Sequence, residues 1–278
     1  MAFTTITYEV SHRIAAITLN RPEARNAFTL TMADELNAAL LAADGDDSVR
    51  VVILRAAGKH FCVGMDMSDG DPTVGDSDDP YWDEPATRVA RPLTNLNKPV
   101  IAAIQGAAVG VGLSMTLPAD FRLASDDARF GFVFARRGLF PEGGSLWFLP
   151  HLVGLAKAKD WMISGRVFDA REALAAGLIT GVHPPEELWP AADALAQDIC
   201  ANIAPVSAAV IRRGLVAMAA RGNPETAFSI DKQTISYGFG TEDMAEGVAS
   251  FLEKRAAEFT GVARAVVARF PWLVFSRE

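Results

Sequence analysis

The stretch NKPVIAAIQGAAVGVGLSMTLPADFRLAS (residues 97–125) decides the fold class of this chain. Within it, residues 100–104 form an apolar, partly β-branched run that predicts a buried strand. Glycines interrupt the run, a helix is expected from about Gly110, and residues 121–124 predict another strand. A strand, a glycine-bearing loop and a helix in succession are typical of α/β folds, and we expect that class here.

The same stretch has to be compared with a membrane span. Residues 100–119 contain no charged side chain over roughly the length that crosses a bilayer. However, they contain three glycines, a glutamine and a penultimate proline, and most of their side chains are small. Their hydrophobicity is therefore weak, and we expect a buried strand, turn and helix rather than a span.

The rest of the chain divides into a strand-bearing N-terminal part and a helical C-terminal part. The hydrophobic patterns predict strands at 5–10, 14–19 and 49–54 and a helix at 31–41. From residue 154 onward the chain becomes helical. Helices are expected there at 187–200, 205–220, 225–236 and 241–259.

Residues 67–87 interrupt this pattern. They are acidic, rich in Gly, Pro and Ser, and show no periodicity, which predicts a loop. Tyr81 and Trp82 are its only large apolar side chains next to each other, and they are candidates for contact with a ligand. A lid and a plain solvated loop are both open interpretations of this segment.

Composition limits the function classes. The chain has 278 residues and a formal net charge of −8, which argues against nucleic acid or an anionic membrane as the main partner. Its two cysteines, Cys62 and Cys200, lie far apart and have no companion at metal-ligand spacing. We therefore expect no disulfide framework and no metal site, and a reducing cytoplasm is the simplest location.

Two glycine-bearing loops follow predicted strands: FCVGMD (61–66) and GAAVGVGLS (106–114). Each delivers backbone N–H groups at the carboxyl end of a strand, and the second opens a helix, where free N–H groups favour negative charge. Two such groups that converge would form an oxyanion hole. Tight turns with no chemical role are the alternative. The glycine spacing does not fit a dinucleotide-binding fingerprint.

One acid stands out in the stretch GLFPEGGSLWFLP (138–150). Glu142 lies between a proline and two glycines, and Phe140, Trp147 and Phe148 are its aromatic neighbours in the sequence. Desolvation by these rings would raise the pKa of the carboxyl group toward the range of a general base. The alternative is a carboxylate at a helix N-terminus that accepts hydrogen bonds from the amides of residues 143–146.

The motifs together resemble one family. These are LNRPEARNAF (19–28), AAGKHFCVGMD (56–66), the stretch 97–125, ARFGF (128–132) with the PEGGS turn (141–145), SGRVFDAREALAAGLITGV (164–182) and EGVASFLEKR (246–255). Their type and order resemble the crotonase, or enoyl-CoA hydratase/isomerase, superfamily. The resemblance covers about residues 5–260, and an ordered set of this length is specific.

The resemblance implies a fold and a partner. It implies a spiral of ββα turns in residues 1–200 and a helical trimerisation region in residues 201–278, with a homotrimer or a dimer of trimers as the assembly. It implies an enzyme that binds acyl-CoA thioesters and needs no separate cofactor, because coenzyme A is part of the substrate. The segment 260–278 extends beyond the usual end of the family, and its apolar content predicts docking on its own fold or on a neighbour.

The resemblance also implies site residues. Met65, after Gly64, and Val111, after Gly110, correspond to the residues whose amides hold the thioester oxygen. Val111 stands where glycine is usual, so the hole needs an ordinary backbone conformation there. Further substrate-binding positions are Arg25, Ala27, Lys59, Val63 and Trp147. Arg25, Lys59 and Lys254 are candidates for the phosphates of coenzyme A, although plain surface solvation is the alternative for each.

The acids of the family separate its reactions. Hydratases use two glutamates to hold a water molecule, and Ser114 and Phe134 stand at those two positions. Glu142 falls on the position of the single acid of Δ3,Δ2-enoyl-CoA isomerases. We therefore favour isomerisation, with hydration by the single glutamate or a non-catalytic acyl-CoA-binding protein as alternatives. Asp66 and Asp120 are expected to be structural.

Overall fold

The computed structural model describes residues 2–68, 82–221, 223–267, 269–270 and 272. Its main sheet has six strands in the order β1-β2-β3-β4-β6-β9. The strands are β1 (Ile6–Ser11), β2 (Ile14–Leu19), β3 (Val51–Ala56), β4 (Val100–Ile104), β6 (Phe121–Ser125) and β9 (Gly181–His183). β1 and β2 form an antiparallel hairpin, and every later pairing in this sheet is parallel. The expected strands and the α/β class are confirmed.

A second, smaller sheet was not expected from the sequence. It has the order β5-β7-β8, from β5 (Ala107–Val109), β7 (Arg129–Gly131) and β8 (Val167–Asp169). The chain passes from β4 into β5 at Gly106, whose φ is +56° and where a Cβ atom would lie 2.8 Å from Nδ1 of His60. Only glycine therefore fits at the point where the chain leaves the first sheet for the second.

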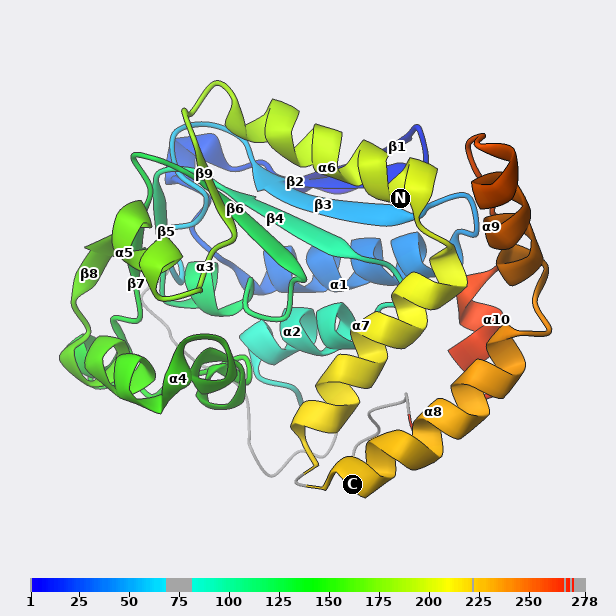
Figure 1. Cartoon of the computed structure of the whole chain (residues 1–278). Coiled ribbons are helices and arrows are strands. Elements are labelled where there is room, and N and C mark those ends of the chain that lie inside the picture. Colours follow the sequence, from blue (N-terminus) through cyan, green and yellow to red (C-terminus); the bar gives the residue numbers. More distant parts are fainter. Residues whose placement is uncertain (1, 69–81, 222, 268, 271, 273–278) are drawn as a thin grey trace.

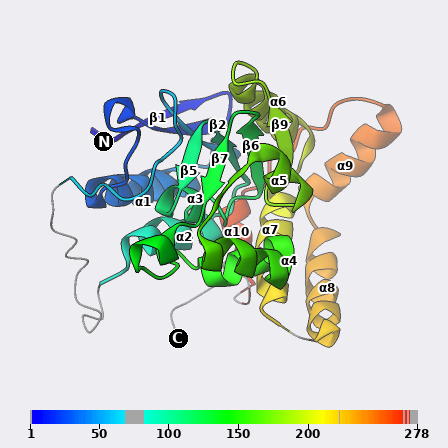
Figure 2. The same cartoon turned by 90° about the vertical axis from the view of Figure 1, so that its left-hand side faces the viewer.

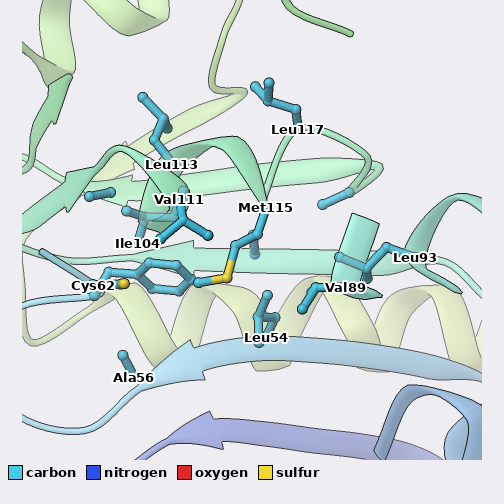
Figure 3. Close-up of a cluster of buried hydrophobic side chains, with 14 of the residues drawn as sticks. Leu54, Ala56, Cys62, Val89, Leu93, Ile104, Val111, Leu113, Met115 and Leu117 are labelled. Atoms are coloured by element: carbon cyan, nitrogen blue, oxygen red, sulfur yellow. The ribbon is translucent and has the colours of Figure 1, made fainter. Parts of the chain in front are cut away.

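Helices cover both faces of the main sheet (Figure 1). α1 (Leu30–Gly45) and α2 (Pro85–Asn95) lie on one face, and α6 (Leu188–Asn202) lies on the other. Apolar side chains of α1, α2, α3 (Val111–Ser114) and one face of the sheet form the larger core cluster. Figure 3 shows part of this cluster, in which Leu54 of the sheet lies near Val89 of α2, and Ile104 of the sheet lies near Val111 of α3.

Several helix bounds differ from the expected ones. α2 begins at Pro85, inside the expected loop 67–87, and residues 69–81 of that loop, including Tyr81, lie outside the described residues. α4 (Ser145–Ser164) begins before residue 154, and it is kinked at Gly154, which has a φ of +77°. α3 has only four residues.

The C-terminal part consists of helices, as expected. After α5 (Ala170–Ala175), α6 and α7 (Pro205–Ala219) come α8 (Pro224–Gly238), α9 (Glu242–Glu253) and α10 (Ala263–Val267). α9 ends at Glu253 rather than at 259, because Lys254 adopts a left-handed conformation with a φ of +55°. In Figures 1 and 2, α8 and α9 lie at the edge of the molecule, away from the main sheet.

Two buried arginines attach α7 to the sheet-bearing part. Arg212 donates from Nε to Asp120 over 2.7 Å and from Nη1 to the Leu96 carbonyl oxygen over 2.7 Å. Arg213 donates from Nη1 to the Asn95 carbonyl oxygen over 2.6 Å. Charge-assisted bonds of this kind are strong when they are buried. The division of the chain at residue 200 stays a prediction, but α7 is firmly connected across it.

The described part of the C-terminal extension packs on its own chain. Val266 and Phe270 are buried against Val206, Val210 and Tyr237. This is one of the two dockings that the apolar content of the segment predicts. Among the described residues no single helix is long and apolar enough to cross a membrane. α6 and α7 reach that length and apolar character only when they are taken together, and this pair is bent by 114°.

Candidate active site

The two glycine-bearing loops lie side by side at the carboxyl end of the parallel strands. Cys62 donates its amide to the Ala107 carbonyl oxygen over 3.0 Å, and Val109 donates to the Cys62 carbonyl oxygen over 3.0 Å. A Cβ atom on Gly110 would lie only 4.0 Å from the Cα atom of Gly64. The backbones of the two loops therefore approach each other at these two glycines.

Met65 has an amide that the surrounding ladder does not use. Phe28 donates to the Gly64 carbonyl oxygen and accepts from Asp66, both over 2.8 Å. The N–H of Met65, between them, meets no acceptor in the part of the chain that the structure describes.

Val111 provides a second free amide. It is the first residue of α3, where an N–H group has no intrahelical acceptor, and the described residues offer it no other. Its side chain lies in the core beside Ile104 and Met115 (Figure 3), so only its backbone is available for a ligand. The positive φ is at Gly110, at +56°, and Val111 has an ordinary conformation. An unpaired buried N–H group is costly, which indicates a site for an acceptor.

Gly112 fixes this arrangement, and the sequence did not single it out. A Cβ atom there would lie 2.7 Å from Cβ of Cys62 and would also collide with the Cys62 carbonyl oxygen. α3 therefore packs directly on the backbone of the first loop, and only glycine allows that contact.

Glu142 lies in a turn that two left-handed glycines shape. Gly143 and Gly144 have φ values of +58° and +70°, and α4 begins after them without a side-chain cap. The carboxylate of Glu142 accepts no hydrogen bond from the amides of residues 143–146, and the Gly143 amide instead donates to Oε2 of Glu84 over 3.2 Å. The interpretation of Glu142 as a satisfied carboxylate at a helix N-terminus is therefore wrong.

The pKa of the Glu142 carboxyl group is raised by its surroundings. Burial, and after it the charge of the nearby Glu84 carboxylate, raise its pKa from 4.5 to about 7. Burial also raises the pKa of the Cys62 thiol to about 12, with a smaller contribution from the charge of Glu142. The Glu142 carboxyl group is thus within electrostatic reach of the loop that carries Gly64 and Met65.

The aromatic surroundings of Glu142 differ in part from the expected ones. Phe140 is 86% exposed, so its expected contribution to the burial of Glu142 is wrong. Phe148 borders the turn, since a Cβ atom on Gly144 would lie 3.2 Å from its ring. Trp147 is half-buried and stacks on His151 with 4.3 Å between ring centroids.

The two positions of the hydratase glutamates are both buried. Ser114 has no exposed surface, and its hydroxyl lies 3.5 Å from the Val111 carbonyl oxygen. Phe134 begins the short helix η2 (Phe134–Arg137), and its ring would lie 3.8 Å from a Cβ atom on Gly110. An apolar ring and a hydroxyl therefore stand beside the two loops where carboxylates were possible.

Two of the three candidate phosphate-binding cations lie near each other. Arg25 and Lys59 are exposed, and after burial their charges lower the pKa of His60. These two cations therefore both lie near His60. Lys254 lies at the end of α9, in the C-terminal part.

The remaining positions have structural contacts. Ala27 is buried and its carbonyl oxygen accepts from Arg21 over 2.7 Å, while Val63 is half-buried next to Gly64. Asp66 pairs with Arg21 at 3.0 Å. Together with the contact between Asp120 and Arg212, this confirms the structural interpretation of both aspartates. No group of three or more potential metal ligands occurs among the described residues.

Comparison with known proteins defines the class. The family model for enoyl-CoA hydratase/isomerase matches residues 9–262. The solved structure of a probable enoyl-CoA hydratase/isomerase from Mycobacterium abscessus is similar, with a TM-score of 0.84 at 30% identity, and the match covers 94% of this chain and 100% of the other. This chain therefore has the crotonase fold and belongs to the enoyl-CoA hydratase/isomerase family of acyl-CoA enzymes.

The relatives carry more than one activity in their names. An enoyl-CoA hydratase of Alternaria alternata is 37% identical over 88% of this chain and 82% of its own length. A probable enoyl-CoA hydratase of Rhodobacter capsulatus is 36% identical over 94% of this chain and 100% of its own length. The 1,2-epoxyphenylacetyl-CoA isomerase of Escherichia coli is 31% identical over 91% of this chain and 97% of its own length.

Proposed function

We propose that this chain isomerises enoyl-CoA thioesters and moves the double bond from the 3 to the 2 position, with Glu142 as the proton carrier. The observation that carries the proposal is the pKa of about 7 of this half-buried carboxyl group near the two loops with free amides. A group with such a pKa occurs in both protonation states at neutral pH. It can therefore remove one proton and return it elsewhere on the same substrate.

The free amides supply the other half of the reaction. Removal of a proton from C2 turns the thioester into an enolate whose oxygen carries negative charge. The N–H groups of Met65 and Val111 would donate hydrogen bonds to that oxygen, and one such donor is typically worth about 3 kcal/mol in the barrier. Glu142, protonated after the first step, then delivers the proton to C4, and no water enters the balance.

In the part of the chain that the structure describes, no second carboxylate is available beside the two loops, and this supports isomerisation over hydration. Ser114 and Phe134 cannot act as acids. Glu84 is near Glu142, but its two carboxylate oxygens already accept from Ala86, Thr87 and Gly143. Hydration by Glu142 alone is the second candidate, and the relatives named enoyl-CoA hydratases favour it. A non-catalytic acyl-CoA-binding protein is the third.

Substrate binding follows from the positions around the two loops. We propose that Arg25 and Lys59 bind the phosphates of coenzyme A, whose thioester then extends past Ala27 and Val63 to the glycines of the hole. Phe134 and Trp147 would contact the acyl chain. The apolar ring of Phe134 beside Gly110 favours a hydrocarbon rather than a hydrated group at that point.

Oligomerisation is proposed from the C-terminal helices. Phe239, Phe251 and Leu252 of this region are 69%, 81% and 73% exposed. Large exposed apolar side chains that gather on one part of a molecule mark interaction surfaces. We propose that α8 and α9 contact a second copy of the chain in a trimer or a dimer of trimers.

The test is a comparison of two substrates and three proteins. The unmodified protein, Glu142→Gln and the control Glu9→Gln, which changes an exposed residue on β1, are incubated with a 3-enoyl-CoA and a 2-enoyl-CoA. The unmodified protein and the control should convert the 3-enoyl-CoA to its conjugated isomer. Glu142→Gln should be slower by on the order of 10²- to 10⁴-fold.

Each contrary result has a distinct meaning. Faster hydration of the 2-enoyl-CoA than isomerisation of the 3-enoyl-CoA would make the chain a hydratase. Full activity of Glu142→Gln would remove the assigned role of this residue. Binding of both thioesters without turnover would leave the acyl-CoA-binding protein.

A further inference from the structure

We infer that Glu84 is a positioning residue for Glu142: from the N-terminus of α2 it holds the turn that carries Glu142 and places a second negative charge beside it. This inference rests on the proposed function, since it gives Glu84 its meaning through the proton carrier. Glu84 does not touch the reacting atoms in this proposal. It acts only through the place and the charge of its neighbour.

The first observation is a clasp between two segments that are far apart in the sequence. Oε1 of Glu84 accepts from the Ala86 amide over 2.7 Å, and Oε2 accepts from the amide and the hydroxyl of Thr87, each over 2.9 Å. These bonds cap the first turn of α2. Oε2 also accepts from the Gly143 amide over 3.2 Å, so the same carboxylate joins α2 to the turn next to Glu142.

The second observation is a close packing contact at the same place. A Cβ atom on Gly143 would lie 3.1 Å from Cβ of Ala86, so the turn lies directly against the first turn of α2. The φ of +58° at Gly143 also disfavours any residue with a side chain. The position of the Glu142 backbone is therefore set by the start of α2, through one hydrogen bond and one contact.

The third observation is that, among the described residues, no cation of the neighbouring elements pairs with either of the two carboxylates. In α2, Arg88 pairs with Asp34 at 2.9 Å and Arg91 pairs with Asp83 at 3.3 Å. The other charged or titratable groups nearby are directed elsewhere or are neutral. Arg136 donates to the Ser164 carbonyl oxygen, Arg137 is exposed, His151 is bonded to the Trp147 carbonyl oxygen, and Cys62 is a buried thiol.

The charge has a defined consequence. A like charge beside a carboxyl group favours its protonated form, and the Glu84 carboxylate does contribute to the raised pKa of Glu142, after burial. Glu84 thus helps to keep Glu142 protonated for the second half of an isomerisation.

Two substitutions separate the charge from the clasp. Glu84→Gln removes the charge, and its single carbonyl oxygen can take the place of Oε2 and keep the three hydrogen bonds that Oε2 accepts, including the one from Gly143, while the bond that Oε1 accepts from the Ala86 amide is lost. The acidic limb of the pH profile of kcat/KM should move to lower pH by on the order of one pH unit. Glu84→Asp keeps the charge but is too short to cap α2 and reach Gly143 together. It should lower kcat by on the order of 10- to 100-fold and leave the acidic limb in place.

A measurement without substrate makes the result independent of the proposed function. The Tm of the protein is compared with the Tm of Glu142→Gln at each pH from 4 to 9. The same comparison is then made between two proteins that both carry Glu84→Gln. A third comparison, between two proteins that both carry Glu9→Gln, is the control. Below the ordinary pKa of 4.5 the difference between the two curves is constant, and above it the difference grows with pH until Glu142 ionises in the folded protein. The pH at which the difference stops growing therefore reports the pKa of Glu142 in the folded protein. It should move to lower pH only with Glu84→Gln.

The outcomes are distinguishable. If the difference stops growing at the same pH in the Glu84→Gln background, the inference about charge is overturned, whether or not any enoyl-CoA reacts. If that pH is shifted in a protein that isomerises no substrate, the coupling of the two glutamates is kept and only the proposed function is removed. If Glu84→Gln does not fold, the positioning role is tested with Glu84→Asp. A kcat of Glu84→Asp equal to that of the unmodified protein overturns that role.

Discussion

Replacement of Glu142 by glutamine should make the protein more stable above neutral pH while it removes the activity. The pKa of the Glu142 carboxyl group is raised from 4.5 to about 7, first by burial and then by the charge of Glu84. The folded state therefore binds this proton more tightly than the unfolded state does. As the pH rises through this window, ionisation of Glu142 costs the folded state free energy.

The magnitude follows from the two pKa values. A tenfold change in acidity corresponds to about 1.4 kcal/mol, so the rise from 4.5 to about 7 corresponds to about 3 kcal/mol of lost stability at pH 8. Below about pH 4.5 the carboxyl group is protonated in both states and the loss disappears. Glutamine has nearly the same shape and never ionises, so Glu142→Gln escapes the loss at every pH.

Urea unfolding at pH 5 and at pH 8, at one fixed protein concentration, measures this difference. The stability advantage of Glu142→Gln over the unmodified protein should be below ~1 kcal/mol at pH 5 and about 3 kcal/mol at pH 8. Glu9→Gln, on the exposed strand β1, should show no such pH dependence. An advantage of Glu142→Gln that is the same at both pH values would refute the raised pKa and, with it, the physical reason for calling Glu142 a proton carrier.

Two further predictions concern the frame of the site and the assembly. Gly112→Ala should lower the free energy of unfolding by about 1–3 kcal/mol in the same urea assay, and it should also lower the activity, because the added methyl group has no room beside Cys62. A Gly112→Ala variant that is as active and as stable as the unmodified protein would contradict the packing of α3. Phe251→Asp, at an 81% exposed position on α9, should reduce the mass measured by analytical ultracentrifugation toward that of one chain. An unchanged mass would move the interface away from α9.

The fold was largely predictable where burial is complete. Residues 100–104 form β4 with the expected bounds, because every side chain of that strand is buried and the apolar run has no gap. The three-residue strands of the second sheet are too short to show a periodicity, so they were missed. The whole of α2 was missed: no helix was expected between residues 41 and 110, and a proline at its first position reads as a loop residue in an acidic stretch.

The site was predictable in part, and the limits are physical. Glu142 stood out because an acid between proline and glycine among apolar residues has no local reason to be there. Its aromatic neighbour Phe140 was placed wrongly, because exposure depends on which way the turn faces and only the tertiary structure sets that. Glu84 was invisible, since its link to Gly143 joins residues that are 59 positions apart.

The candidate oxyanion hole consists of backbone amides, whereas the candidate acid is a side-chain carboxyl group. This difference suggests how one family can include several activities. The amides of Met65 and Val111 are positioned by loop-to-loop hydrogen bonds and by the close approach that Gly112 permits, so the side chains at both positions can vary. Enolate stabilisation is therefore retained when nearby residues change. Which proton moves next, and to which carbon, depends on where the carboxyl groups stand around that hole. Among the described residues the candidate carboxyl group is Glu142, and in our proposal its hydrogen-bonded link through Glu84 sets where it stands, so this pair is where we expect a change of reaction to begin.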